Sequence, residues 1–148
     1  MSEALKPHCV IVDTNIWCSE CLLKTTVGRN FVYVLQRQGG FIGLPEVVEL
    51  ELTENVVKVG RKAGSRWWTV STLMDLDTRA PTDEEMGQKV KERLTELDKL
   101  IHRVPFTLEH AKAALQMVNA KVAPNSDEDQ QFKDSAIWQA TKKNETAD

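Results

Sequence analysis

Three polar residues, Asp13, Thr14 and Asn15, directly follow an apolar run near the start of the chain and are the first that could do chemistry. The run, from Cys9 to Val12, is short and mostly β-branched, which predicts a strand buried on both faces, as in a parallel sheet. Ligands of open α/β sheets bind beyond the carboxyl ends of the strands, where Asp13 would lie. Asp, Thr and Asn are also good helix N-caps and turn formers. Asp13 therefore has two interpretations, a capping residue or a functional carboxylate.

More acids follow a second predicted strand, Phe41 to Leu44. Pro45 stands at a natural first-turn position of the next helix, and the helix dipole favours an acid beside it. Most glutamates of this helix are expected to be solvated or to compensate the dipole, whereas one that points back to the first strand would be functional. The four are Glu46, Glu49, Glu51 and Glu54.

A further acid, Asp134, lies on the first turns of a final predicted helix, about Asp129 to Lys142. Asp13, one of the four glutamates and Asp134 stand out together by context. Clustered carboxylates repel one another and stay together only if they share protons or hold a cation. Mg²⁺ and Mn²⁺ are the natural partners of such oxygen ligands. The set predicts metal-assisted phosphate chemistry.

The cysteines offer a rival chemistry. Cys9, Cys18 and Cys21 are odd in number and lie close to the N-terminus, which argues against a disulfide framework. Cys18 and Cys21 form a lone C-x-x-C, a spacing found in redox motifs and in half of many zinc sites. Because no second C-x-x-C or H-x-x-x-H completes it, thiols that pack a helix are the favoured interpretation.

The composition is that of one ordinary globular domain: 148 residues, of which 41% are hydrophobic and 28% charged. No apolar run approaches the roughly 20 residues of a membrane-spanning helix, and the first residues have no signal-peptide core. We therefore expect a cytoplasmic protein with no membrane partner. The net charge of −3 supplies no whole-protein field for nucleic acid, although a local basic patch can still bind it.

The densest basic stretch lies in the middle of the chain and ends at two adjacent indoles, Trp67 and Trp68. One interpretation is a contact with nucleic acid, since cations and aromatic rings serve phosphates and bases. The favoured one is a solvated helix end followed by two indoles that pack into the core. The cations are Lys58, Arg61, Lys62 and Arg66.

The rest of the chain predicts mainly helices, so we expect an α/β fold with a short parallel sheet flanked by several helices. His102 and His110 fall within these helices and are interpreted as surface or packing residues rather than ligands. The predicted helices are Trp17 to about Gln38 with an interruption at 25–28, about Ser65 to Leu76, Asp83 to about His102, and a helix capped by Thr107 that runs to about Val122.

Three pieces in this order resemble the PIN-domain nucleases, and more closely a PIN-like subgroup with the ending Lys-Asp-Ser-x-Ile-Trp. The resemblance covers residues 9 to about 142, and the middle helices match only in character. It implies a single PIN-like domain over 1–148. The pieces are residues 10–17, VIVDTNIW, residues 44–52, LPEVVELEL, and residues 133–138, KDSAIW.

Carried over position by position, the resemblance implies that Asp13, Glu51 and Asp134 hold Mg²⁺ or Mn²⁺. Asn15 resembles the polar residue that supports the first Asp, and Thr14 would help it to orient the carboxylates. Glu49 takes the place of Glu51 if the register is off by two. The implied function is a metal-dependent ribonuclease in which a metal-activated water displaces the 3′ oxygen of the phosphate. The implied partners are single-stranded RNA, an antitoxin or other protein, and a second copy in a homodimer.

Members of the family usually continue beyond this last helix into another strand and a turn that carries a further acid. The sequence here stops at Asp148, soon after that helix. Two expectations follow: a piece of a longer protein, or a shortened member whose C-terminal strands and one ligand are missing. The rival function is a non-catalytic PIN-like module that binds RNA or a protein, and a redox or zinc protein using Cys18 and Cys21 is the third.

Overall fold

The computed structural model describes residues 7–125 and 131–142. It is an α/β structure in which three short strands are interleaved with six helices among these residues. In chain order the elements are β1 (Cys9–Ile11), α1 (Thr14–Ser19), α2 (Thr26–Arg37), β2 (Phe41–Pro45), α3 (Glu46–Leu73), α4 (Asp83–Glu96), β3 (Ile101–Val104), α5 (Leu108–Asn119) and α6 (Phe132–Lys142).

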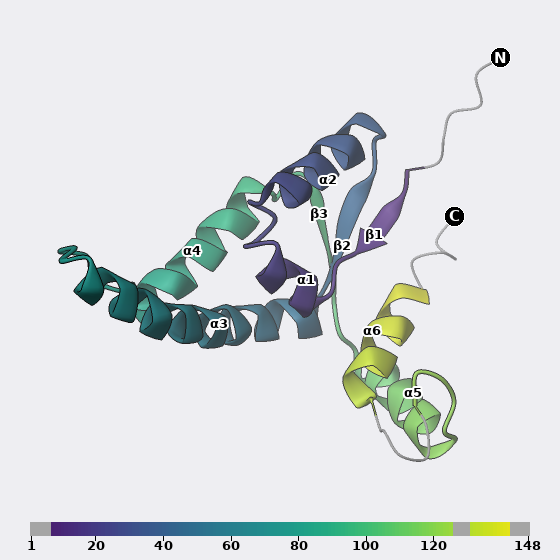
Figure 1. Ribbon diagram of the computed structural model, residues 1–148. Helices are drawn as coiled ribbons and strands as arrows, with labels where there is room; N and C mark the ends of the chain where they lie inside the picture. The colour runs from purple at the N-terminus through teal and green to yellow at the C-terminus, as the bar shows by residue number, and fades with distance from the viewer. Residues whose placement is uncertain (1–6, 126–130, 143–148) are drawn as a thin grey trace.

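The three strands form a parallel sheet in the order β1-β2-β3. Ile11 pairs with Gly43, and Gly43 in turn pairs with His102. The central strand β2 is buried from Ile42 to Pro45, as expected for a parallel strand covered on both sides. The strands run side by side, and their carboxyl ends point to the region where α1 and α3 begin (Figure 1). The predicted short parallel sheet flanked by helices is confirmed.

Strand β3 was not predicted from the sequence, because the helical spacing of apolar residues extends the preceding predicted helix to about His102. In the structure α4 ends at Glu96, a turn follows, and Ile101 begins the third strand. The error has a clear cause: Val90, Leu94, Leu97 and Ile101 are all buried at helical spacing, although the last two lie beyond the helix. His102 is consequently an exposed strand residue, edge-on to the ring of Phe41.

Trp17 ties α1 to the end of β1. Its ring is fully buried, and its Nε1–H donates a hydrogen bond to the Val12 carbonyl oxygen at 3.1 Å. The interruption predicted at 25–28 lies a few residues earlier: α2 already begins at Thr26, and the break is a turn in which Cys21, Leu22 and Leu23 all have positive φ. Leu22 and Leu23 are buried, so the turn contributes to the core. The main core lies around these residues, with Leu35, Ile42, Leu44, Val48, Leu52, Val90, Leu94, Leu97 and Leu100.

Helix α3 is a single helix from Glu46 to Leu73, where the sequence suggested two. Its second half extends away from the sheet, with α4 beside it (Figure 1). Trp67 and Trp68, predicted to pack into the core, are 46% and 64% exposed, so that interpretation is wrong. The cause is the position of the indoles, on a part of the helix that extends beyond the sheet.

Helices α5 and α6 pack against each other, and α6 also contacts α3 and β2 (Figure 1). Thr107 caps α5, as predicted, in a capping box with His110. The α6 start predicted near Asp129 lies outside the described residues, within which this helix begins at Phe132. None of the helices in the described parts of the chain is long and apolar enough to cross a bilayer.

Candidate active site at the carboxyl edge of the sheet

The residue predicted to be functional, Asp13, lies just beyond the carboxyl end of β1. It is the N-cap of α1, and its Oδ2 accepts a hydrogen bond from the Asn15 backbone N–H at 3.4 Å. Its side chain is still 44% exposed, so the carboxylate can bind a ligand while it caps the helix. Both interpretations of Asp13 are therefore compatible with its position. Asn15 supports it through the backbone.

The first turns of α3 reach the same edge, because α3 begins directly after the central strand. Glu51 faces this region: its Oε2 lies 2.5 Å from Nζ of Lys133, the second residue of α6. The same Nζ lies 4.0 Å from Oδ1 of Asp13 and donates to the Thr14 hydroxyl at 3.4 Å. The Lys133 ammonium thus connects the first turn of α6 to the residues that follow β1 and to the early turns of α3, which follows β2.

The other glutamates of α3 have different partners. Glu49 Oε1 pairs with Arg103 Nε of β3 at 3.3 Å, and Glu46 Oε2 accepts from the Phe106 backbone N–H at 2.8 Å. Glu54 pairs with Lys58 one turn further along the helix. Of the four glutamates, Glu51 is thus the one joined to Asp13 through a common cation.

Asp134 approaches Asp13 from another direction. The two carboxylates line an open cavity of about 280 Å³ whose other walls are mostly apolar: Ile11, Ile137, Trp138 and Thr141. Asp134 is exposed at the start of α6. Asp13 therefore has an acidic neighbour on each of two sides. Glu51 lies on the other side of the Lys133 ammonium, and Asp134 lies on the cavity wall.

The described residues contain no group of three His, Cys, Asp or Glu side chains placed to hold a metal ion. Asp13, Glu51 and Asp134 lie in one region without forming such a cluster. The donors are nonetheless of the right kind for Mg²⁺ or Mn²⁺, since all are carboxylate oxygens. The space between Asp13 and Glu51 already holds a positive charge, the Lys133 ammonium.

Lys133 is the site residue that sequence reasoning missed. It lies in the KDSAIW segment, directly before Asp134, but no function was predicted for it. A lysine beside an aspartate on a helix is a common surface pattern, so nothing local distinguishes it. Its position against Asp13 and Glu51 arises only from the packing of α6 on α3.

The cysteines are the other candidate site that the sequence suggested. All three thiols are free, and Cys21 is exposed. Burial, then the nearby Asp13 carboxylate and Cys21, raise the pKa of the Cys18 thiol, which disfavours the reactive thiolate.

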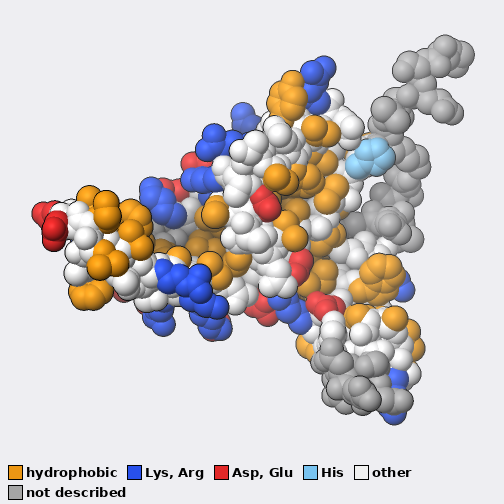
Figure 2. All heavy atoms as spheres, in the orientation of Figure 1, with side chains coloured by type: hydrophobic (Ala, Val, Ile, Leu, Met, Phe, Trp, Pro, Cys, Tyr) orange, Lys and Arg blue, Asp and Glu red, His pale blue; other side chains and the backbone are white. Residues whose placement is uncertain are grey.

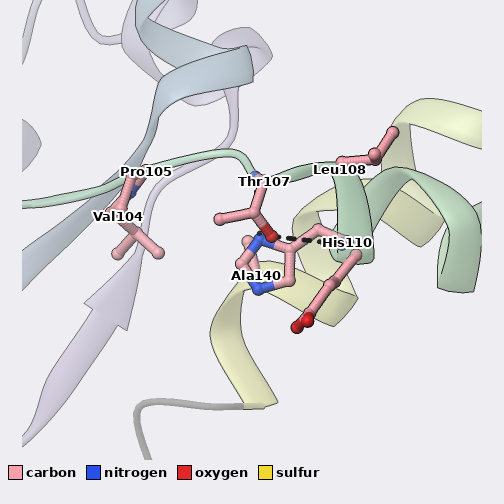
Figure 3. Close-up of a pocket in the computed structure, with 7 residues that line it drawn as sticks. Val104, Pro105, Thr107, Leu108, His110 and Ala140 are labelled. Carbon is pink, nitrogen blue, oxygen red and sulfur yellow. Dashed lines mark hydrogen bonds between the residues drawn. The ribbon is translucent and has the colours of Figure 1, made fainter.

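Another cavity, of about 550 Å³, lies away from these acids, between the end of β3, α5 and α6 (Figure 3). His110 is its buried polar residue. Its Nδ1 accepts from the Thr107 N–H at 3.3 Å, and its Nε2 is the buried side-chain atom without a partner among the described residues. Because His110 completes the cap of α5, its position has a structural explanation, in agreement with the packing role expected from the sequence.

No protein-family model, curated protein or solved structure matches this chain. The fold and the site define an α/β protein with carboxylates gathered at the carboxyl edge of a parallel sheet. An assignment of function depends on that geometry and on the sequence motifs.

Proposed function

We propose that the chain is a PIN-like, metal-dependent ribonuclease whose site contains Asp13, Glu51 and Asp134. One observation carries the proposal: the Asp13 and Glu51 carboxylates, which follow two adjacent strands, converge on a single cationic atom. Carboxylates that converge at the carboxyl edge of a parallel sheet are placed where such folds bind ligands. The family resemblance implied Glu51 rather than Glu49 as the metal ligand. In the structure Glu51 pairs with Lys133 beside Asp13, whereas Glu49 pairs with Arg103.

Asp13 and Glu51 would hold Mg²⁺ or Mn²⁺, with Asp134 as a further donor from across the cavity. A divalent ion bound there would supply a nucleophile at neutral pH and stabilise charge on the phosphate. Lys133 is about one-third exposed and carries its charge on a flexible stem, so its ammonium can move aside. In its new position it would contact a phosphate as a point charge.

Single-stranded RNA is the substrate that the surface of α3 favours. Lys58, Lys62 and Arg66 follow Glu51 at intervals of seven, four and four residues, so all four lie on one face of the helix. Within the described ranges, no ion-pair partner is found for Lys62 or Arg66. Lys and Arg side chains gather over the middle of α3 in Figure 2. A strand bound there would have cations for its phosphates close to the carboxylates.

The second candidate is a non-catalytic module that binds RNA or a protein partner. The Lys133 ammonium favours it, because a lysine between two acids stabilises them without any metal. The lack of a three-acid group among residues 7–125 and 131–142 points the same way. Such a module would keep the basic face of α3 and bind RNA without cleaving it.

The deciding experiment is cleavage of a labelled single-stranded RNA with Mn²⁺, Mg²⁺ or EDTA. We expect metal-dependent cleavage that Asp13→Asn and Glu51→Gln abolish. Glu49→Gln is the matched control, since it makes the same change two residues away on a side chain that pairs with Arg103. RNA binding without cleavage by the folded protein would establish the non-catalytic module instead.

A toxin role within a toxin–antitoxin pair belongs to the same proposal. Expression in a bacterial host should then arrest growth, and Asp13→Asn should remove the arrest. Growth that is unaffected by an active nuclease would separate the enzyme from the toxin role.

A further inference from the structure

An indole borders the cavity that Asp13 and Asp134 line. Trp138 lies on α6 one turn after Asp134, and its side chain is 52% exposed. The ring does not stand alone on the surface, because Ile11 of β1 and Ile137 of α6 continue the apolar wall. Ligand sites in proteins have this character, an apolar and aromatic lining with a few polar groups. The cavity therefore offers a ligand an aromatic contact directly beside two of the proposed site's carboxylates.

The surface of α6 continues this arrangement along the helix. Asp134, Trp138 and Lys142 follow one another at intervals of four residues, so they are neighbours on one helix face, each about 6 Å further along the axis. The Lys142 Nζ lies 5.3 Å from the centroid of the indole. Lys142 is not among the residues that line the cavity, so it leaves the cavity side of the ring uncovered. The helix thus presents an acid, an aromatic ring and a cation in line.

The size of the cavity suits one nucleobase. Its volume of about 280 Å³ is that of roughly nine molecules of liquid water, at about 30 Å³ each. This is more than a single planar heterocycle needs. The cavity is also open, so a base can enter it while the sugar and the phosphate stay outside.

The chemistry of the lining favours a base over a phosphate. The walls are apolar apart from the two carboxylates, so a phosphate can approach them only through a metal ion. A base is uncharged and has an aromatic face that stacks on an indole. Its exocyclic amino group can also donate a hydrogen bond to a carboxylate, as cytosine does to Asp or Glu.

We propose that Trp138 stacks on one base of a single-stranded RNA, that of the nucleotide whose phosphate lies at Asp13 and Asp134. Lys142, next along the helix, then supplies a cation for the phosphate of the neighbouring nucleotide. This inference rests on the proposed function, because it takes RNA as the ligand. It makes Trp138 a substrate-binding residue and extends the path of the RNA from α3 across the carboxylates to α6.

Binding of a labelled single-stranded RNA, measured by fluorescence anisotropy, tests the stacking. Every protein carries Asp13→Asn, so that the RNA is not cut. Trp138→Ala should weaken binding by roughly 5- to 150-fold, the effect of removing one aromatic ring that stacks on a base. Trp138→Phe keeps an aromatic face and should lose much less. Circular dichroism would establish that each variant is folded.

Tyr33→Ala is the matched control. Tyr33 is 57% exposed and also has a cation one turn later, the Arg37 guanidinium, whose Cζ lies 5.8 Å from the ring centroid. It lies on α2, which leads into the amino end of β2, whereas the carboxylates lie at the other edge of the sheet. The change should therefore leave RNA affinity unaltered.

A series of RNAs with one base removed separates stacking from a structural role of the indole. The parent protein should lose affinity when the base is missing at one particular nucleotide. Trp138→Ala should lose no further affinity at that nucleotide, because the contact is already absent. If Trp138 only supported the helix, the missing base would weaken the parent and the Trp138→Ala protein by equal factors.

The outcomes distinguish the stacking from the proposed function. Equal RNA affinity of the Trp138→Ala and parent proteins, an equal loss in Tyr33→Ala, or equal effects of the missing base would overturn the stacking while RNA binding itself stands. The expected pattern of binding, without cleavage by the chain that retains Asp13, would support the stacking and overturn the nuclease. A folded chain that binds no RNA would overturn both.

Discussion

The Lys133 ammonium lies 2.5 Å from Glu51 and 4.0 Å from Asp13, although the lysine is far from both in sequence. It brings the start of α6 to the carboxyl edge of the sheet and balances two carboxylates there. Under the proposed function a divalent cation would compete with this lysine, because both would neutralise the same pair of carboxylates. This competition can be measured without any assay of activity.

Lys133→Met should make the fold more responsive to Mg²⁺. Removing the ammonium leaves the negative charges of Asp13 and Glu51 without a neutralising cation. A divalent ion should therefore bind the native state more tightly and raise Tm. The ion pairs are partly exposed, so the loss of stability without metal should be under about 1 kcal/mol. Thermal unfolding with and without Mg²⁺ measures both effects.

Arg103→Met is the control for that experiment. It removes the same charge from beside two other acids, Glu49 and Asp98. Its Tm should not gain any greater response to Mg²⁺ than the unmodified chain has. Equal responses in the two variants would show that the site at Asp13 has no preference for the ion.

The basic face of α3 should contribute to RNA affinity in a salt-dependent way. Neutralising Lys62 and Arg66 to Gln should reduce the slope of log K against log salt by about 1.4, at about 0.7 per phosphate contact of a single strand. Fluorescence anisotropy with Asp13→Asn protein separates binding from cleavage. Lys91→Gln, an exposed change on α4, should leave the slope unchanged. An unaltered slope in the double variant would place the RNA elsewhere.

The sequence predicted β1, β2 and the cap of α5, because each has a local signal: a β-branched run, a short apolar run that ends at a first-turn Pro, or a Thr before a segment of helical spacing. It failed for β3, because Ile101 continued the helical spacing of α4. It also misjudged Trp67, whose burial depends on how far a helix extends past the sheet. The candidate site divides in the same way: motif and position selected Asp13 and Glu51 as candidates, whereas the place of Lys133 between them depends on the packing of α6.

The start of α4 should lose stability in acid. Arg79, followed by the Thr82 backbone, lowers the pKa of Glu85 from 4.5 to about 2. A carboxyl with a depressed folded pKa contributes stability that is present above its unfolded value and lost as pH falls through the folded one. Glu85→Gln should therefore lower Tm at pH 7, and the difference from the unmodified chain should shrink between about pH 4.5 and 2. Glu84→Gln, the adjacent exposed acid, is the control. A difference that stays constant over this range would contradict the role of the ionised cap.

Trp17→Phe should loosen the whole site, because the indole fixes the residue that precedes Asp13. The change deletes the hydrogen bond to the Val12 carbonyl and leaves that buried oxygen without its donor. We expect a loss of about 1–3 kcal/mol in urea unfolding, the cost of an unsatisfied buried polar group. Trp138→Phe, at a half-exposed indole, should stay within about 0.5 kcal/mol. If the site depends on this anchor, RNA cleavage by Trp17→Phe should fall even at temperatures where the variant is fully folded. Full cleavage by a destabilised variant would show that α1 holds Asp13 in place without the indole.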